Sequence, residues 1–461
     1  MTASPPLPTA RPRWPGEFTV GIARSPLALF TRLARAHGDV VRFRAAGRTF
    51  VVVAHPELAR EVLVTQQRRF VRGYAHRTLR LLLGDGLLTS EGDLHRRQRR
   101  LANPAFHRDR IAAYARAMSA AAERWSDRWE RRSPTDVEVD VAAEMTTLTL
   151  GIAGETLFGT DVGDRARDVA GAIGDAMRVA PLAFLPFARW ALRLPLPHVG
   201  GFVSARHRLD RIVYGIIAER RAAADADRRD DLLSMLLVAT DPEETDGEPM
   251  SDEQLRDEVM TLFLAGHETT ANLLAWTWLL LGRNPDAEAC LHAELDAMLG
   301  AGPAARAPTF DDLPRLPYTR SVLAESMRIY PPAYAIGRIC VERCTLGGVD
   351  VEPGWGVVTS PWLTHHDARW WPEPERFRPE RWSEPAPDRP KFAYFPFGGG
   401  SRICIGEQFA WTEATLVLAT LASRWRLELL PDQHVAPLSR ITLRQRPGAR
   451  ARLVPRSPAP S

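Results

Sequence analysis

A ten-residue segment near the C-terminal end constrains this chain more than any other feature. Residues 397–406 read Phe-Gly-Gly-Gly-Ser-Arg-Ile-Cys-Ile-Gly. Glycines lack a Cβ and let the backbone approach a ligand closely, while Arg402 and backbone amides can stabilise a thiolate at Cys404. Phe397 can keep water away from the sulfur. A lone cysteine in a glycine turn is more often a buried structural residue, so other segments must decide between the two interpretations.

A long helix is predicted over residues 251–281. Ser and Gln at its first and fourth positions are typical of a capping box. The middle of this otherwise apolar helix carries Ala-Gly-His-Glu-Thr-Thr over residues 265–270. Buried polar groups are costly unless they are bonded or used. Thr269 can simply bond a carbonyl one turn earlier, or Glu268 and Thr269 can together deliver protons to a ligand.

A second helix is predicted over residues 318–329, and it stops before a Pro-Pro pair, as the steric rule requires. It carries Glu325 and Arg328 one turn apart. Alone, such a pair is typical of a protein surface and contributes roughly 0.2–0.5 kcal/mol. Further along, residues 374–382 read Pro-Glu-Arg-Phe-Arg-Pro-Glu-Arg-Trp and include Arg381.

A basic run, Leu-His-Arg-Arg-Gln-Arg-Arg, occupies residues 94–100. On its own it is typical of a solvated basic helix or a nucleic-acid patch. The whole chain argues against nucleic acid, because 60 basic residues, all but one of them arginine, are scattered among 56 acidic residues and leave a net charge of only +4. Nucleic-acid-binding proteins usually concentrate their charge in one patch, so no such partner is expected.

Taken together and in this order, these segments resemble the motifs of the cytochrome P450 family. The cysteine segment matches Phe-x-x-Gly-x-Arg-x-Cys-x-Gly at every fixed position, and Glu325 with Arg328 matches the family's Glu-x-x-Arg. The resemblance extends from a β-hairpin predicted near Val40 to the helix after the cysteine segment. It implies a mainly α fold with a large helical region and a small β region. Haem would lie between the long central helix and the cysteine loop with its following helix.

The resemblance also assigns roles to individual residues. Cys404 would ligate the iron of haem b through its thiolate. Ala265 and Gly266 would leave room for dioxygen, and Glu268 with Thr269 would supply protons for its activation. The residues that would bind the cofactor are His95, Arg99, Arg338, Phe397, Gly398, Arg402, Cys404 and Gly406.

Further residues would support the loop and shape the pocket. Glu325, Arg328 and Arg381 would form a buried structural triad that positions the cysteine loop. The expected substrate pocket comprises Phe263, Leu264, Ala335 and Ile336, together with a loop over residues 71–88, a proline-rich stretch over 179–200, and residues 439–442. Because these segments are largely apolar, a lipophilic substrate such as a terpenoid, fatty acid or polyketide is expected.

The predicted activity is a monooxygenase that inserts one oxygen atom of O2 into a C–H bond or forms an epoxide. Two alternatives stay open: a peroxide-driven peroxygenase, whose members generally lack the acid–alcohol pair, and a non-catalytic haem-thiolate sensor, which usually carries an output domain. The resemblance implies electrons from NAD(P)H through separate partners, a ferredoxin or flavodoxin with its reductase. Arg96, Arg97 and Arg100 are expected to face outward and attract such an acidic partner.

The remaining predictions concern organisation and location. We expect a flexible arm over residues 1–16, a single catalytic domain over 17–455 and a flexible tail over 456–461. Four cysteines form no disulfide framework at this length, and Cys340 and Cys344 are expected to pack together rather than to bind zinc. No transmembrane segment is evident, so a protein of the bacterial cytoplasm is expected. The protein is also expected to be a monomer. His267 is expected to be structural rather than a second iron ligand.

Overall fold

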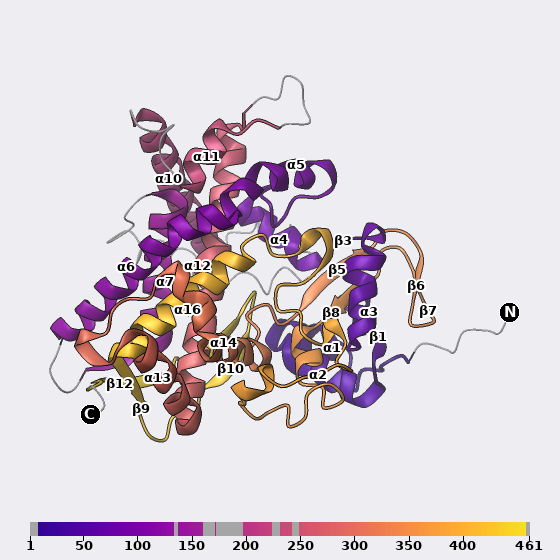
Figure 1. Ribbon diagram of the computed structural model, residues 1–461. Coiled ribbons are helices and arrows are strands. Elements are labelled where there is room, and N and C mark those ends of the chain that lie inside the picture. The colour runs from indigo at the N-terminus through magenta and orange to yellow at the C-terminus, as the bar shows by residue number, and fades with distance from the viewer. Residues whose placement is uncertain are drawn as a thin grey trace.

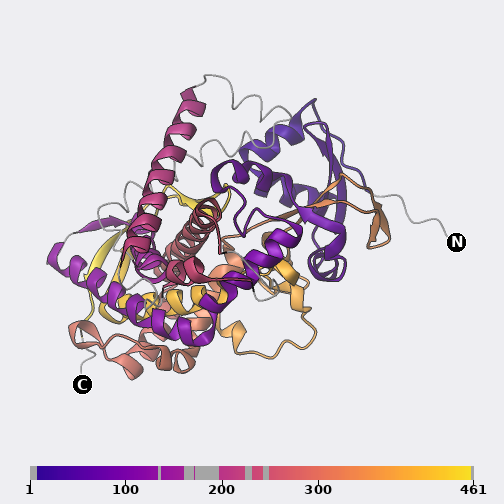
Figure 2. The same cartoon turned by 90° about the horizontal axis from the view of Figure 1, so that it is seen from above.

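The computed structural model describes residues 8–132, 137–159, 171, 197–223, 231–241 and 249–457. A helical body carries the long helices, and a smaller β region lies beside it near the N-terminal arm (Figure 1). The view from above separates the same two parts (Figure 2). The predicted mainly α fold with a small β region is confirmed.

The helices are α1 (Glu17–Arg24), α2 (Pro26–His37), α3 (Pro56–Arg60), α4 (Tyr74–Leu83), α5 (Gly92–Ala102), α6 (Arg108–Arg132), α7 (Val141–Phe158), α10 (Pro197–Ala222), α11 (Leu232–Val238), α12 (Asp252–Arg283), α13 (Pro285–Leu299), α14 (Pro317–Ile329), α15 (Pro361–His365) and α16 (Glu407–Arg424). The strands are β1 (Val40–Ala45), β2 (Arg48–Val53), β3 (Phe70–Arg72), β4 (Glu138–Asp140), β5 (Ile336–Cys340), β6 (Cys344–Leu346), β7 (Val349–Val351), β8 (Gly356–Thr359), β9 (Trp425–Leu429), β10 (Ala436–Ser439), β11 (Leu443–Arg446) and β12 (Arg450–Pro455).

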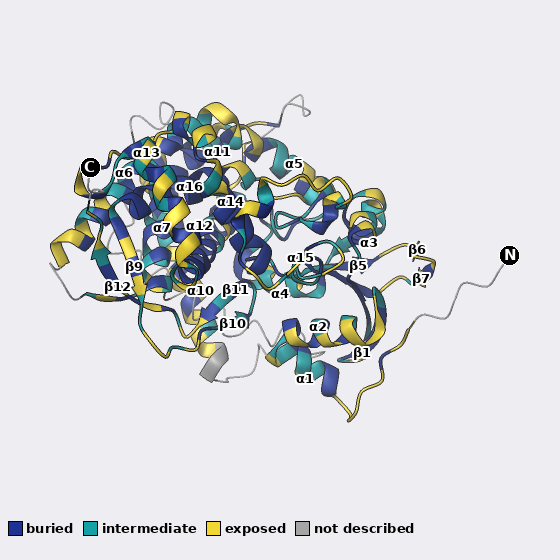
Figure 3. Ribbon diagram, turned by 60° about the horizontal axis from the view of Figure 1, so that its bottom comes forward, coloured by how far each residue is buried: buried dark blue, intermediate teal, exposed yellow. Residues whose placement is uncertain are grey.

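Helix α12 forms the centre of the helical body. The predicted capping box is present, because the Ser251 side chain accepts from the Gln254 backbone N–H and the Gln254 side chain accepts from the Ser251 N–H. Helices α7, α10, α14 and α16 pack around α12, and most of its length is buried (Figure 3). A helix that is apolar on nearly all sides belongs in a core, which explains why the sequence pattern located it well.

The β region is built on a five-stranded sheet with the order β1-β2-β8-β5-β3. Strands β1 and β2 form the predicted hairpin, whose turn contains Gly47 at φ +74°, a left-handed conformation that favours glycine. At the far edge, β3 pairs antiparallel with β5 and places Arg72 directly opposite Arg338. Directly opposed residues project from the same face of a sheet, so these two arginines are neighbours.

Residues 71–88 were expected to form a loop, and this expectation is wrong for much of the range. It contains the end of β3 and the whole of α4, which stops at Gly84, where φ is +62°. A helix of ten residues is marginal by itself and depends on its contacts with the rest of the fold. The segment after α4 is fastened to α12, since the Leu87 N–H donates to Glu258 at 3.1 Å.

The chain after the cysteine segment returns to the helical body. Helix α16 begins directly after that segment and packs on α6, α12, α13 and α14. The hairpin of β10 and β11 then contacts α12, while β9 and β12 join β4 in a separate sheet near the C-terminal end (Figure 1). The cysteine segment therefore joins the β region to the deepest helices of the core.

Candidate active site

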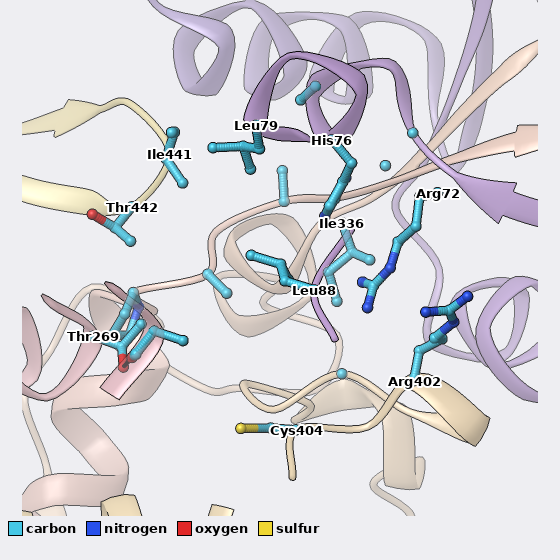
Figure 4. A pocket seen from close by; sticks show the side chains of 18 of the residues that line it. Arg72, His76, Leu79, Leu88, Thr269, Ile336, Arg402, Cys404, Ile441 and Thr442 are labelled. Carbon is cyan, nitrogen blue, oxygen red and sulfur yellow. Dashed lines mark hydrogen bonds between the residues drawn. The ribbon is translucent and has the colours of Figure 1, made fainter. Parts of the chain in front are cut away.

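A cavity of about 510 Å³ lies between α12 and the cysteine segment. Its walls also include α4, β5 and the tip of the β10–β11 hairpin, and most of the lining side chains are apolar. Figure 4 shows Cys404 on one wall and Thr269 and Thr442 on another, with Arg72 and Arg402 at one side. Concave, mainly apolar spaces with a few convergent polar groups are typical of ligand sites.

A backbone hydrogen bond within the cysteine segment fixes the position of Cys404. The Cys404 N–H donates to the Phe397 carbonyl at 3.0 Å. Gly398 and Gly400 adopt φ values of +76° and +71°, and a Cβ at Gly400 would lie 2.0 Å from the Leu63 carbonyl oxygen. Only glycine fits that close approach, so the glycine pattern is explained by the path of the backbone.

The Cys404 side chain is exposed and lines the cavity. Burial raises the pKa of its thiol to about 11, while the Gly406 N–H and Arg99 act in the opposite direction. The nearby cation is thus Arg99, which donates to the Ile403 carbonyl at 2.8 Å. Thiol ligands lose their proton when they coordinate a metal ion.

Four guanidinium groups gather at one side of the cavity: Arg72, Arg99, Arg338 and Arg402. The sequence interpretation included three of them and missed Arg72. Only the pairing of β3 with β5, which places Arg72 opposite Arg338, brings it into the site. A single carboxylate, Glu91, bonds Arg402 and accepts from the Arg72 backbone N–H at 2.6 Å.

Two histidines lie beside this group of arginines. His95 is on α5, and burial together with the arginines lowers its pKa to about 3. His76, which the sequence interpretation missed, lies on α4, and burial lowers its pKa far below the usual value. Both side chains line the cavity and are neutral at ordinary pH.

These residues fit haem. The cationic side of the cavity sets four guanidinium groups against the single carboxylate of Glu91, and haem carries two carboxylates. The apolar walls match the faces of a porphyrin, and Cys404 offers a sulfur ligand on one wall. Phe397, Gly398 and Gly406 also line the cavity next to the sulfur.

On the opposite wall, α12 presents Ala265, Gly266 and Thr269 to the cavity. The Thr269 hydroxyl donates to the Ala265 carbonyl at 2.7 Å, one turn earlier. The local bond anticipated from the sequence is therefore present. His267 is turned away, since its Nδ1 contacts the Phe263 carbonyl at 2.6 Å and only 2% of the residue is exposed.

Glu268 is buried next to Thr269 and points toward the β10–β11 hairpin. Its Oε1 accepts from the Thr442 hydroxyl and lies 2.7 Å from the Arg444 guanidinium. Its Oε2 has no hydrogen-bond partner in the described part of the chain. Because Arg444 is partly exposed, this contact connects the carboxylate with the molecular surface.

Behind the cysteine segment, Glu325, Arg328 and Arg381 form a buried ion-pair network. Glu325 lies 2.8 Å from Arg328 and 2.9 Å from Arg381, and all three side chains are at most 1% exposed. Both arginines also donate to backbone carbonyls of residues 372–376. The network thereby joins α14 to the segment that precedes the cysteine loop.

Three of the four expected pocket residues, Leu264, Ala335 and Ile336, line the cavity. Phe263 is not among its lining residues and instead packs against Phe158 with ring centroids 5.4 Å apart. Successive helical residues differ by about 100° in direction, and here Leu264 faces the cavity while Phe263 is turned toward α7. Residues 439–442 contribute to the lining, while 179–196 lie outside the described residues.

The expectation that three arginines of α5 face outward holds for Arg96 alone, whose side chain is 67% exposed. Arg100 bonds the buried carboxylate of Asp241 at 2.6 Å, and Arg97 lies 3.9 Å from it. Arg97 and Arg100 thus serve an internal contact between α5 and the segment after α11.

Cys340 and Cys344 are both buried, and the described residues contain no cluster of three potential metal ligands.

Comparison with known proteins agrees with this geometry. The chain matches the cytochrome P450 family over residues 5–449. It is 41% identical to cyclooctatin synthase of Streptomyces melanosporofaciens over 430 residues, which cover 92% of this chain and 90% of the relative. It is 39% identical to cyclooctat-9-en-7-ol 5-monooxygenase of the same organism, over 90% of this chain and 87% of the relative. Pentalenene oxygenase of Streptomyces avermitilis is 36% identical, over 94% of each chain. The chain belongs to the cytochrome P450 family and is a haem-thiolate monooxygenase.

Proposed function

We propose that this monooxygenase oxidises a terpenoid skeleton. The observation that carries the proposal is the apolar cavity, which Cys404 and Thr269 face from opposite walls. Two relatives are named for the oxidation of pentalenene and of cyclooctat-9-en-7-ol. An apolar cavity of this kind suits a hydrocarbon substrate better than a polar one.

The cofactor would be haem b, with Cys404 as its iron ligand. When bound, haem supplies the activation of O2 and the transfer of one oxygen atom to the substrate. Arg99, Arg338 and Arg402 would bind its carboxylates, with His95 as an additional donor. Phe397, Gly398 and Gly406 would shape the space around the sulfur and keep water from it.

Glu268 and Thr269 would deliver protons to the cavity, next to the space left by Ala265 and Gly266. The free Oε2 of Glu268 offers a position for a proton that arrives from the surface near Arg444. The Thr269 hydroxyl can rotate from the Ala265 carbonyl toward a water molecule in the cavity. An acid and an alcohol in sequence form a short route for proton transfer.

Electrons would come from NAD(P)H through a ferredoxin or flavodoxin and its reductase. The catalytic domain would comprise residues 17–455, between terminal arms at 1–16 and 456–461, and would act as a monomer in the bacterial cytoplasm. No helix of the described residues is long and apolar enough to cross a membrane.

The test is a product assay with labelled oxygen. Haem-loaded protein is incubated with NADPH, a surrogate ferredoxin and its reductase, a diterpene hydrocarbon such as abietadiene, and ¹⁸O2. We expect a product that contains one labelled oxygen atom and no product from Cys404→Ala. Product with hydrogen peroxide alone would favour the peroxygenase alternative. Loss of the thiolate-type carbon monoxide spectrum in Cys404→Ala checks the proposed ligand independently.

A further inference from the structure

The carboxylate of Glu268 is bonded asymmetrically. Three donors converge on its Oε1: the Thr442 hydroxyl, and the Nε and Nη2 atoms of Arg444 at 2.9 and 2.7 Å. Its Oε2 is buried and accepts no hydrogen bond from any described residue. An arginine fork frequently binds both oxygens of a carboxylate at once, which gives the stronger pair. Here both arms of the fork meet one oxygen, so another contact has to hold the carboxylate out of that bidentate arrangement.

Thr442 supplies this contact from the turn of the β10–β11 hairpin. Its hydroxyl donates to Oε1 of Glu268 and accepts from the Asn272 side-chain amide at 3.2 Å. A hydroxyl carries a single proton. Because the Asn272 amide is itself a donor, the proton of the hydroxyl is directed to Glu268. Both Thr442 and Asn272 are buried, so this direction is set by protein groups rather than by solvent.

The hairpin is fixed to α12 by bonds that do not involve this carboxylate. The Trp276 indole donates to the Leu443 carbonyl at 3.0 Å, and the Gln445 side chain donates to the Ala275 carbonyl at 2.9 Å. Both bonds come from residues that directly follow Thr442 or from the next turns of α12. The place of the Thr442 hydroxyl is therefore determined by the packing of the hairpin on the helix.

Arg444 is less restrained than the group it contacts. Its side chain is 36% exposed, whereas that of Glu268 is 7% exposed. Figure 4 shows Thr442 on the same side of the cavity as Thr269, and both residues line the cavity with Glu268. A guanidinium that moved onto both carboxylate oxygens would thus occupy the oxygen that is now free at this wall.

We propose that Thr442 is a positioning residue for proton delivery: it keeps Arg444 on Oε1 of Glu268 and leaves Oε2 available for the proton. The inference rests on the proposed proton route through Glu268 and Thr269. In the transfer, the O–H bond at Oε2 breaks and an O–H bond forms on the Thr269 hydroxyl, which passes its own proton to a water molecule in the cavity. Oε2 then regains a proton from solvent.

The first test is the crystal structure of haem-loaded Thr442→Val. Valine has nearly the shape of threonine but has no hydroxyl, so Oε1 of Glu268 loses one donor. We expect the Arg444 guanidinium to bond both carboxylate oxygens in this variant. Thr442→Ser retains the hydroxyl and should keep Oε2 free. A free Oε2 in the valine variant would overturn the inference, and this result does not depend on the choice of substrate.

The second test measures coupling with NADPH, the surrogate ferredoxin and its reductase, and abietadiene. In Thr442→Val the product formed per NADPH should fall about tenfold, while hydrogen peroxide rises in its place. The loss should be smaller than that of Glu268→Gln, because the carboxyl group is still present. The ratio of the rates in H2O and D2O should increase, since proton transfer becomes slower. Thr442→Ser should couple normally.

Removal of the guanidinium distinguishes positioning from a purely structural role. In Thr442→Val with Arg444→Gln, no group is left to close on Oε2, so the double variant should recover most of the coupling that Thr442→Val loses. Such non-additivity indicates a direct interaction between the two sites. The control is Thr277→Val, which removes another buried hydroxyl of α12, one that donates to the Leu273 carbonyl at 2.8 Å. This variant should couple normally.

The outcomes separate this inference from the proposals on which it rests. Losses that add in the double variant, or normal coupling in Thr442→Val beside a loss in Glu268→Gln, would overturn the role of Thr442 alone. Normal coupling in both single variants would overturn the proposed proton route as well. If the unmodified protein forms no product from abietadiene, the terpenoid proposal is wrong. The crystal structure and the peroxide formed per NADPH without ligand then decide the role of Thr442.

Discussion

Two buried carboxylates on neighbouring helices, Glu325 on α14 and Glu268 on α12, differ in how completely the protein bonds them. Both oxygens of Glu325 are occupied, by Arg328, Arg381, the Arg378 N–H and the Trp382 indole. Glu268 is bonded at one oxygen only among the residues that the structure describes.

We expect this difference to separate residues that hold the site from residues that act in it. A fully bonded network resists displacement, because any motion breaks several bonds in a region of low dielectric constant. A carboxylate with a free oxygen can exchange a proton or accept from water without losing its existing bonds. Arg72 repeats the second pattern on the cationic side of the cavity. We expect changes in the first group to lower stability and changes in the second to lower activity.

The largest expected effect is the loss of Glu325. Glu325→Ala leaves the buried Arg328 and Arg381 without their carboxylate, so the free energy of unfolding should fall by about 3–5 kcal/mol. Urea unfolding followed by tryptophan fluorescence measures this change. The control is Arg376→Ala, which removes an exposed ion pair with Glu373 in the same region and should cost less than about 1 kcal/mol. Equal stability of the two variants would refute the structural role of the triad.

Glu268→Gln should leave the fold intact and slow the reaction. The amide keeps an acceptor for the Thr442 hydroxyl, but it cannot carry the proton. Product formation should fall by about 100-fold, the lower end of the range for a positioned proton donor. Steady-state turnover with the redox partners measures this effect. Glu253→Gln, at an exposed position near the start of the same helix, should turn over normally. A similar loss in both variants would argue against a proton route through Glu268.

A third test uses pH and a buried carboxyl that has no arginine among its partners. Glu413 on α16 is fully buried, both of its carboxyl oxygens lack a hydrogen-bond partner among the described residues, and burial raises the pKa of this carboxyl to about 8. In the unfolded chain the same group has an ordinary pKa near 4.5. The folded state therefore binds the proton more tightly, and stability should fall as pH rises from about 5 to 8.

Because of this one group, the free energy of unfolding should fall by at most about 1.4 kcal/mol per pH unit. Glu258, whose pKa burial also raises to about 8, should contribute in the same direction. Urea unfolding at several pH values measures the slope, and Glu413→Gln should reduce it. An unchanged slope in the variant would mean that Glu413 is ionised in the folded protein.

The smallest expected effect concerns Thr269. Thr269→Ala removes the hydroxyl that faces the cavity but leaves room for an ordered water, which can replace it in part. NAD(P)H consumption should continue while the yield of product per NAD(P)H falls, with ligand binding unchanged. Thr269→Ser should retain normal coupling. Normal coupling in the alanine variant would show that protons reach the cavity by another route.

The long helices and the cysteine segment could be predicted from the sequence, because their signals are local. The capping box at Ser251 and the apolar length that follows it define α12. Glycines at tight backbone positions define the segment around Cys404. The short helix α4 was not predicted, since a helix of ten residues is marginal by itself and its stability depends on contacts with the sheet and α12.

By itself, then, the sequence determined the family and predicted Cys404 as the sulfur ligand together with the residues that flank it, since each lies within a short motif whose chemistry depends on neighbours along the chain. Only the tertiary structure decided which side chains from distant segments of the chain come into contact. Strand pairing placed Arg72 opposite Arg338, the β10–β11 hairpin brought Arg444 to Glu268, and the rotation of α12 turned Phe263 away from the cavity. These outcomes depend on register and packing between distant segments, which no local pattern encodes.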